Sequence, residues 1–146
     1  MERARATKRI LIRGGRVIDA ASGFDGPADL LLEGGRIAAR DKPGAIPVRD
    51  AEIVDARKLC VSPGFVDMHV HLREPGYEYK ETVATGARAA VVGGVTSVAC
   101  MANTNPVNDN AAVTSYIIEK AAIAGLANVF PVGAVSLGQK GEQLSE

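Results

Sequence analysis

The sequence predicts an α/β fold in which a small all-β segment precedes alternating strands and helices. In the first part of the chain, short apolar runs are interrupted by paired glycines and show no helical period. After Pro63 and Gly64 the pattern changes to strand, helix, strand, helix, strand. The later strands are continuous apolar runs, which is typical of parallel strands covered by helices. We therefore expect a basic tail over residues 1–8, a β segment over 9–62 and βα units over 63–146.

Composition and charge describe a globular protein without a broadly charged surface. Of the 146 residues, 47% are hydrophobic and 23% are charged, and 17 basic residues balance 17 acidic ones. This balance would not attract nucleic acid or an anionic membrane over a large area. No apolar stretch approaches the roughly 20 residues of a membrane span. We expect a cytoplasmic protein that binds neither nucleic acid nor membrane.

The N-terminal residues and the cysteines bear on the cellular compartment. Residues 1–9 are basic but lack the apolar core of a secretory signal, which favours a solvated tail, with organelle targeting as the alternative. Cys60 and Cys100 both lie in apolar, strand-like runs. We expect two small buried side chains in a reducing compartment, without a disulfide.

Two matching stretches organise the β segment. Residues 11–18 and 31–38 each consist of an apolar run, a Gly-Gly pair and a second apolar run. Because Gly-Gly supplies the positive φ angles of a two-residue turn, we expect two β-hairpins. No Gly-Lys-Ser/Thr follows either pair, which argues against a phosphate-binding loop. Residues 52–55 and 59–61 predict two further strands, and the absence of clustered titratable groups favours a structural role for the segment.

The second segment begins with an apolar strand at residues 65–71, followed by a helix over 79–92 that ends at Gly93. Two more apolar runs predict strands at residues 95–101 and 129–135. The apolar stripe of the helix consists of Val83, Ala87, Ala90 and Val91, and its acidic residues near the positive N-terminal end are Glu78 and Glu81.

A second helix is predicted over residues 111–124. Asp109 can cap its N-terminus, and Gly125 can end it. Its apolar face consists of Val113, Ile117 and Ala121.

The end of the first strand of this segment carries both histidines of the sequence, His69 and His71. Alternate side chains of a strand leave the same face, so the two imidazoles are expected to point the same way. Such a pair can supply two neighbouring metal ligands, each with its other ring nitrogen held by a hydrogen-bond acceptor. The alternative is a pair of half-buried histidines without metal. Asp67 lies on the same side and could orient them.

Two motifs resemble a known enzyme family. Residues 62–76, SPGFVDMHVHLREPG, resemble the metal-binding signature of the amidohydrolase superfamily, and the HLREPG ending resembles the dihydroorotase family. Residues 101–106, MANTNP, resemble the second signature of that family, although Ala102 stands where proline is commoner. The resemblance extends from about residue 9 to the end of the chain.

This resemblance implies a (β/α)₈ barrel of the TIM type beside a β-sandwich, to which residues 9–62 would belong. In the family, residues from the far end of the chain complete the sandwich. A barrel of this type takes about 250 residues, far more than follow Pro63. We therefore expect the chain to be the front part of a longer enzyme.

The resemblance also implies a site for one or two zinc ions, with His69 and His71 as ligands. Zinc would activate water for attack on the cyclic amide of dihydroorotate, which opens to N-carbamoyl-aspartate. Ring closure in the opposite direction belongs to pyrimidine synthesis. The remaining ligands and the proton shuttle would come from later strands, so no catalytic residue can be assigned in this sequence. We expect the 146-residue chain alone to be inactive.

Three residues are implied to bind substrate: His71, Arg73 and Asn103. The Arg73 guanidinium could grip the ring carboxylate of dihydroorotate through two parallel hydrogen bonds, and the Asn103 amide could donate to the same carboxylate. Alternatively, Arg73 forms an ion pair with Glu74 or Glu78, and Asn103 is a turn residue bonded to its own backbone. Residues 74–76 are expected to shape the loop.

Other functions remain open within the same resemblance. A hydantoinase or an allantoinase is the nearest enzymatic alternative, although neither substrate requires a carboxylate clamp. A non-catalytic dihydroorotase-like subunit that scaffolds aspartate transcarbamoylase is a third, although a scaffold has no physical need for His69, His71 and Arg73. A soluble α/β fragment without independent function is the fourth. The resemblance implies a homo-oligomer for the enzyme itself.

Overall fold

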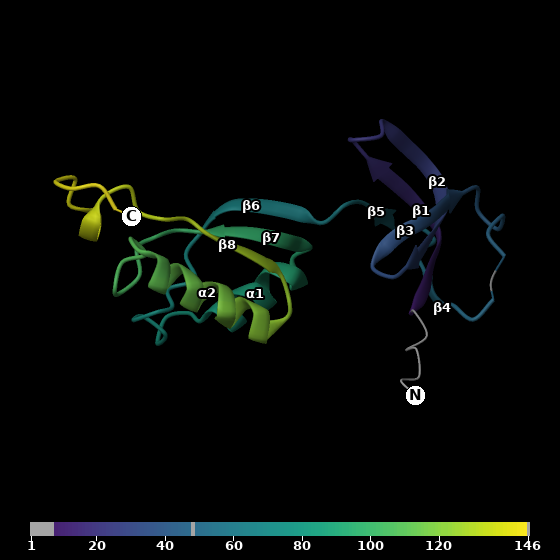
Figure 1. Cartoon of the computed structure of the whole chain (residues 1–146). Helices are drawn as coiled ribbons and strands as arrows, with labels where there is room; N and C mark the ends of the chain where they lie inside the picture. The colour runs from purple at the N-terminus through teal and green to yellow at the C-terminus, as the bar shows by residue number, and fades with distance from the viewer. Residues whose placement is uncertain (1–7, 48, 146) are drawn as a thin grey trace. The chain divides into compact units, whose positions relative to one another are not determined.

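The computed structural model describes residues 8–47 and 49–145, which form two compact units divided between Pro63 and Gly64 (Figure 1). Most of the predicted basic tail lies outside the described residues. No helix within the described ranges is long and apolar enough to cross a membrane.

The first unit is a five-stranded sheet. The strands follow the order β3-β2-β1-β4. β4 pairs with the first half of β1, and β5 pairs with β1 further along, at Arg16 and Val17. β1, β2 and β3 are antiparallel neighbours, whereas β4 and β5 run parallel to β1. The strands are β1 (Arg9–Asp19), β2 (Phe24–Glu33), β3 (Arg36–Asp41), β4 (Glu52–Asp55) and β5 (Cys60–Val61). The two late strands confirm the predictions for residues 52–55 and 59–61.

The two Gly-Gly pairs have different structures. Gly34 and Gly35, with φ of 60° and 75°, form the turn between β2 and β3, which confirms the second hairpin. The first hairpin prediction is wrong, because β1 runs straight through Gly14 and Gly15 with a bulge that shifts its register against β2. Gly14 adopts the positive φ of such a bulge, 70°, and its N–H donates to the buried Asp29 Oδ1 at 2.7 Å.

The cysteines also differ from each other. Both thiols are free, and Cys100 is buried as predicted. Cys60 is exposed, so the prediction of a buried side chain there is wrong. The reason is strand alternation: Val61 packs against the cluster around Val17, and its neighbour Cys60 therefore points to the opposite face.

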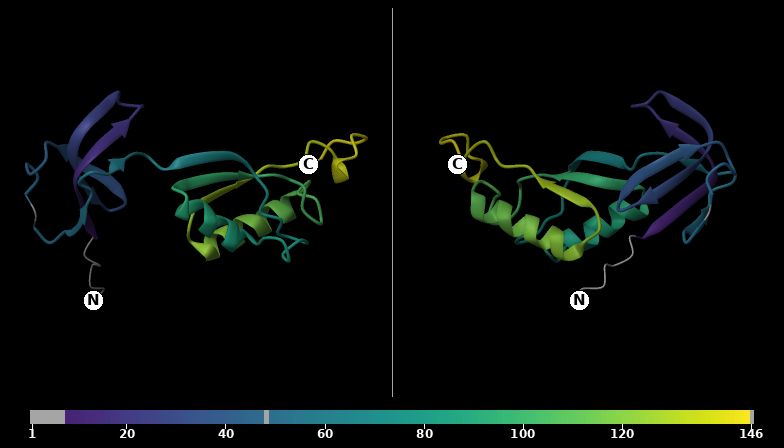
Figure 2. Two further views of the ribbon diagram at one scale, coloured as in Figure 1. Left: turned by 180° about the vertical axis from the view of Figure 1, so that it is seen from behind. Right: turned by 45° about the vertical axis from the view of Figure 1, so that its right-hand side comes forward.

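The second unit is a three-stranded parallel sheet with both helices on one face (Figures 1 and 2). The strand order is β6-β7-β8, so each strand lies beside the next one in sequence. The elements are β6 (Phe65–Val70), α1 (Val83–Val92), β7 (Val95–Cys100), α2 (Ala111–Ala124), β8 (Asn128–Pro131) and a 3₁₀ turn, η1 (Leu137–Gln139). The core between sheet and helices contains Leu72, Val83, Val98, Cys100, Val113 and Ile117.

The start of α1 differs from the prediction by one turn. Thr82 accepts a hydrogen bond from the Thr85 N–H, and the Thr85 hydroxyl accepts one from the Thr82 N–H. This reciprocal cap fixes the helix start at Val83 instead of residue 79. The predicted end at Gly93 is confirmed.

The bounds of α2 match the prediction, but its cap does not. Asn110, and not Asp109, is the N-cap residue, and its side-chain oxygen accepts from the N–H groups of Ala112 and Val113. Asp109 is instead bound by the N–H of Gly138 at 2.7 Å. Both residue types make good caps, so sequence alone cannot choose between neighbours.

β8 is shorter than the predicted run of residues 129–135. After Pro131 the chain follows the loop beyond β7, where the Ala134 N–H donates to the Asn108 carbonyl at 2.7 Å and the buried Asn108 amide donates to the Val132 carbonyl at 3.0 Å.

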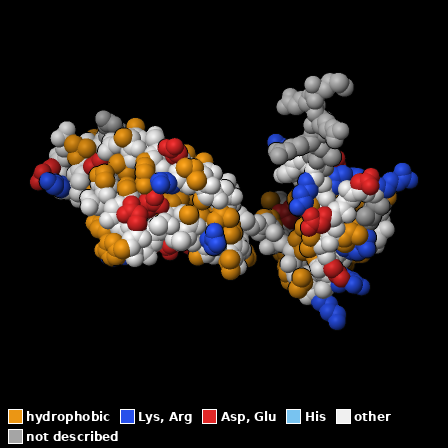
Figure 3. Space-filling view, turned by 90° about the horizontal axis from the view of Figure 1, so that it is seen from below, with side chains coloured by type: hydrophobic (Ala, Val, Ile, Leu, Met, Phe, Trp, Pro, Cys, Tyr) orange, Lys and Arg blue, Asp and Glu red, His pale blue; other side chains and the backbone are white. Residues whose placement is uncertain are grey.

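Apolar side chains stay exposed on the helices, among them Val92, Ile118 and Ile123. Figure 3 looks onto this helical face, where apolar and charged side chains are interspersed.

Candidate metal and substrate site

The candidate site lies at the carboxyl ends of the three parallel strands. His69 ends β6 together with Val70, His71 follows directly, and Asn103 follows β7. The carboxyl ends of parallel strands meet at one edge of a sheet, so residues distant in sequence come together there. A hollow of about 510 Å³ forms at this edge. Its lining consists of His69, His71, Met101, Ala102, Asn103, Val132, Gly133, Ala134, Val135 and Gln139.

The two imidazoles are neighbours in this hollow. The ring centroids of His69 and His71 lie 5.3 Å apart, with an angle of 63° between the ring planes. Both side chains are exposed to solvent, so a ligand can reach them. This arrangement offers two nitrogen donors to one cation.

His71 is held by Asn103. The His71 Nδ1 and the Asn103 Oδ1 lie 2.8 Å apart. An amide oxygen only accepts hydrogen bonds, so Nδ1 is the donor in this contact, and the neutral imidazole with this tautomer has its free lone pair on Nε2. Asn103, which the resemblance assigns to substrate binding, thus also contacts a candidate metal ligand. Its NH₂ group remains a donor for a further partner.

Asp67 contacts the main chain of the histidine strand. Its Oδ1 accepts a hydrogen bond from the His69 N–H at 3.0 Å. The carboxylate therefore orders the backbone at the end of β6 through the main chain of His69 and not through an imidazole ring.

Arg73 has an unusual backbone, and its side chain has no hydrogen-bond or ion-pair partner among the described residues. Its φ is +66°, and the Glu74 N–H donates to the Leu72 carbonyl at 2.8 Å across it. Among the described residues no carboxylate pairs with its guanidinium, because Glu78 accepts from the Gly76 N–H and Glu74 faces other donors. The alternative of an ion pair with either glutamate is therefore wrong for this structure.

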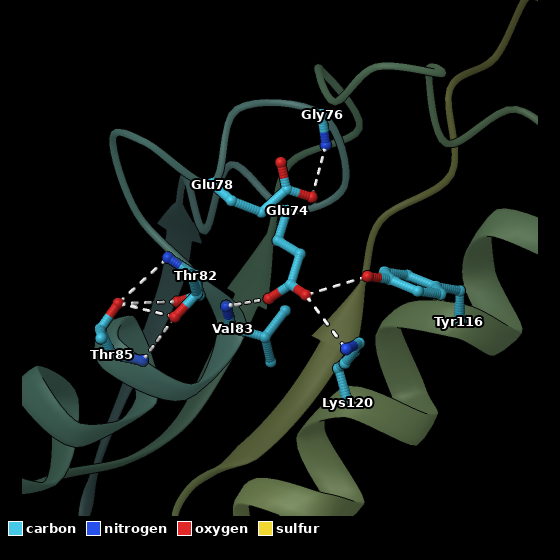
Figure 4. A network of polar contacts seen from close by, with 8 residues as sticks. All are labelled: Glu74, Gly76, Glu78, Thr82, Val83, Thr85, Tyr116 and Lys120. Atoms are coloured by element: carbon cyan, nitrogen blue, oxygen red, sulfur yellow. Dashed lines mark hydrogen bonds and ion pairs between the residues drawn. The ribbon is translucent and has the colours of Figure 1, made fainter.

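Glu74 makes buried contacts that the sequence did not predict (Figure 4). It is only 7% exposed, and its Oε2 accepts from the Val83 N–H at 2.8 Å. Its Oε1 accepts from the Tyr116 hydroxyl at 3.0 Å and lies 3.7 Å from Lys120 Nζ. The expectation that residues 74–76 shape the loop did not name these partners, because they lie on helices distant in sequence.

The pKa values of Tyr116 and Lys120 keep both groups in the protonated form, which donates hydrogen bonds. Burial, followed by the hydrogen bond to Glu74, raises the pKa of Tyr116, so its hydroxyl stays protonated at neutral pH. The neighbouring Tyr116 and Glu74 raise the pKa of Lys120, which stays an ammonium. Both groups therefore present hydrogens to the Glu74 carboxylate.

The donor set matches part of a zinc site. Two imidazoles, one of them held by an amide oxygen, are typical zinc ligands. Zinc needs at least one more protein ligand, and within residues 8–47 and 49–145 no group of three or more His, Cys, Asp and Glu side chains could hold a metal ion. The residues present thus fit two positions of a larger ligand set.

Comparison with known proteins points to one family. Residues 58–146 match the family model described as dihydro-orotase-like. The chain is 58% identical over 137 residues to a dihydroorotase of Geobacter sulfurreducens and 60% identical over 137 residues to one of Anaeromyxobacter sp.. Each alignment covers 94% of this chain, which spans about a third of these relatives, 32% and 31% of their respective lengths.

A solved structure supports the fold. The L-hydantoinase (dihydropyrimidinase) of Arthrobacter aurescens superposes with a TM-score of 0.75 and 24% identity, covering 87% of this chain and 28% of that one. The predicted fold class, the start of a (β/α)₈ barrel preceded by a small β segment, is thereby confirmed.

Proposed function

The chain belongs to the dihydro-orotase-like family, and on this premise we propose that it carries part of the active site of a zinc-dependent dihydroorotase. The observation that carries the proposal is the shared hollow of His69 and His71, in which Asn103 leaves the His71 Nε2 free. The substrate would be dihydroorotate, interconverted with N-carbamoyl-L-aspartate in pyrimidine synthesis in the cytoplasm.

One or two zinc ions would be held by His69 and His71 together with further protein ligands from outside the described residues. When bound, it would polarise the ring amide and activate the attacking water. The part of this chain is to supply two imidazoles in the correct orientation. Asn103 fixes the proton of His71 on Nδ1, and Asp67 orders the backbone from which His69 projects.

Arg73 would recognise the ring carboxylate of dihydroorotate. A planar guanidinium binds a carboxylate through two parallel hydrogen bonds, and the Asn103 NH₂ could add a third. Since Arg73 has no carboxylate partner among the described residues, its guanidinium is available for this role. Substrates that lack the carboxylate would leave these donors unpaired and would bind less well.

The second candidate is a hydantoinase, which the structural likeness to the Arthrobacter enzyme favours. The available guanidinium of Arg73 favours a carboxylate-bearing substrate instead. A non-catalytic subunit that scaffolds aspartate transcarbamoylase is the third candidate, and the retention of His69, His71 and Arg73 speaks against it. For the enzyme we propose a homo-oligomer.

The test is a substrate comparison with the complete enzyme that contains these residues. We expect turnover of dihydroorotate to exceed that of an uncharged hydantoin, to vanish with a zinc chelator and to return with zinc. Stronger turnover of the hydantoin would replace our choice by the second candidate, and no turnover of either substrate by the zinc-loaded protein would favour the scaffold.

A further inference from the structure

We propose that Glu74 is a positioning residue that holds Arg73 ready for a substrate carboxylate. This inference rests on the proposed function, because it assigns to Glu74 a task in the recognition attributed to Arg73. It extends that function to residues of α2, a helix that does not line the hollow with the histidines.

Arg73 needs external support for its conformation. Its φ of +66° lies in the left-handed region, which a side chain with a Cβ atom disfavours. The hydrogen bond from the Glu74 N–H to the Leu72 carbonyl, 2.8 Å long, closes a three-residue turn around it, and turns of this type with positive φ are rare and strained. Such a conformation persists only where the surroundings enforce it.

The two neighbours of Arg73 in sequence hold its backbone in this conformation. Leu72 is 5% exposed and belongs to the core between sheet and helices. Glu74 is 7% exposed, and donors from two helices surround its carboxylate (Figure 4). The Val83 N–H at the start of α1 binds one oxygen, and Tyr116 and Lys120 of α2 approach the other. Since burying a carboxylate without these donors would cost free energy, the donors keep Glu74 in place. Buried Leu72 and Glu74 together fix the chain on both sides of Arg73.

The same network keeps the guanidinium available. An arginine next to a glutamate could pair with it, which would neutralise both groups. Here the donors of α1 and α2 bind both oxygens of Glu74, and the Gly76 N–H binds Oε1 of Glu78 at 2.9 Å. Glu74 thus fixes the backbone of Arg73 without competing with a substrate for its side chain.

The experiment measures KM and kcat for dihydroorotate in the complete enzyme, with Glu74→Gln as the main variant. Glutamine keeps the size of the side chain and an acceptor for the Val83 N–H, but it loses the charge that Lys120 and Tyr116 face. We expect KM to rise about tenfold and kcat to fall less than about threefold, because a misplaced guanidinium weakens binding of the carboxylate. KM does not depend on the fraction of folded enzyme, so mere destabilisation would not raise it. Glu119→Gln removes the same charge from an exposed position of α2 and should leave both constants unchanged.

A second background tests whether Glu74 acts through Arg73. In an Arg73→Met enzyme, whose KM is already raised, adding Glu74→Gln should raise KM no further, since coupled positions are not additive. An unchanged KM in Glu74→Gln, or an equal further rise in the Arg73→Met background, would overturn the inference. If Glu74→Gln does not fold, Tyr116→Phe removes one donor and should raise KM about two- to threefold, again only when Arg73 is present. An inactive parent enzyme, or an Arg73→Met enzyme with unchanged KM, would instead refute the proposed function.

Discussion

At the scale of the residue, the contact between Asn103 and His71 decides which imidazole nitrogen can bind a metal. The amide oxygen accepts from Nδ1, which leaves Nε2 as the nitrogen available to the proposed metal. We predict that Asn103→Leu lowers the zinc affinity of the complete enzyme by about 10- to 100-fold, the usual effect of losing such a partner. Competition with a chromogenic zinc chelator measures the affinity, and Asn105→Ala, at a nearby exposed position, is the control. Equal affinities for Asn103→Leu and the parent would contradict the assignment.

The ion pair of Asp55 with Arg57 predicts how the protein responds to low pH. Hydrogen bonds from the Arg57 side chain lower the pKa of Asp55 from 3.8 to about 2. Because the folded state binds this proton less readily, the stabilisation is complete above about pH 4 and is lost as the pH falls toward 2. Both side chains are exposed, so the effect on the free energy of unfolding is small. NMR titration of the Asp55 carboxyl should give a midpoint near 2, and Arg57→Gln should move it back toward 3.8. A midpoint that Arg57→Gln leaves unchanged would refute the pairing.

The sequence groups some candidate site residues and does not reveal the partners of others, for a physical reason. His69, His71 and Arg73 belong to one short motif at the carboxyl end of β6, so proximity in sequence is sufficient to group them. Glu74 belongs to the same motif, but its role depends on Tyr116 and Lys120, which only the packing of α2 brings close. Its partners could not be predicted without the fold.

At the scale of the element, the two Gly-Gly pairs show that a local signal needs a partner strand to acquire meaning. Both pairs permit a tight turn. At Gly14 the buried Asp29 carboxylate accepts the N–H and favours a bulge, so β1 continues and turns at residues 20–23 instead. At Gly34 and Gly35 no side-chain acceptor from the described part of the chain binds the N–H groups, and the chain reverses. The hydrophobic pattern of the sequence alone does not distinguish the bulge from the turn.

This difference leads to a prediction for the second pair. Gly35 has φ +75° and no atom within 4 Å of an added Cβ, so Gly35→Ala tests the backbone conformation without a clash. We expect the free energy of unfolding of the first unit to fall by about 1–2 kcal/mol, the usual penalty for a side chain in this region. Urea denaturation followed by circular dichroism measures it. Gly26→Ala is the matched control in the same sheet, because there the φ is not positive and the nearest atom, of the Phe24 ring, lies at an ordinary 3.6 Å. If both variants lose the same stability, the turn conformation is not the cause.

At the scale of the whole molecule, the chain corresponds to one part of the relatives that it matches. It spans about a third of its curated relatives, 32% of the Geobacter sulfurreducens dihydroorotase. The alternation of strands and helices predicted the parallel sheet correctly, since that pattern is periodic and local. The metal site is different, because its ligands would come from several strands and this chain supplies two imidazoles.

The last prediction follows from this count of ligands. Two histidines hold zinc weakly, so the 146-residue chain by itself should not open dihydroorotate above the rate in buffer. The loss of dihydroorotate absorbance in the ultraviolet, with and without added zinc, measures this rate. Isothermal titration of the chain with zinc should show weak binding that His71→Asn abolishes and that Asn105→Ala does not change. A zinc-dependent rate from the chain alone would show that two imidazoles and Arg73 suffice for the chemistry, and the need for ligands from later strands would then be refuted.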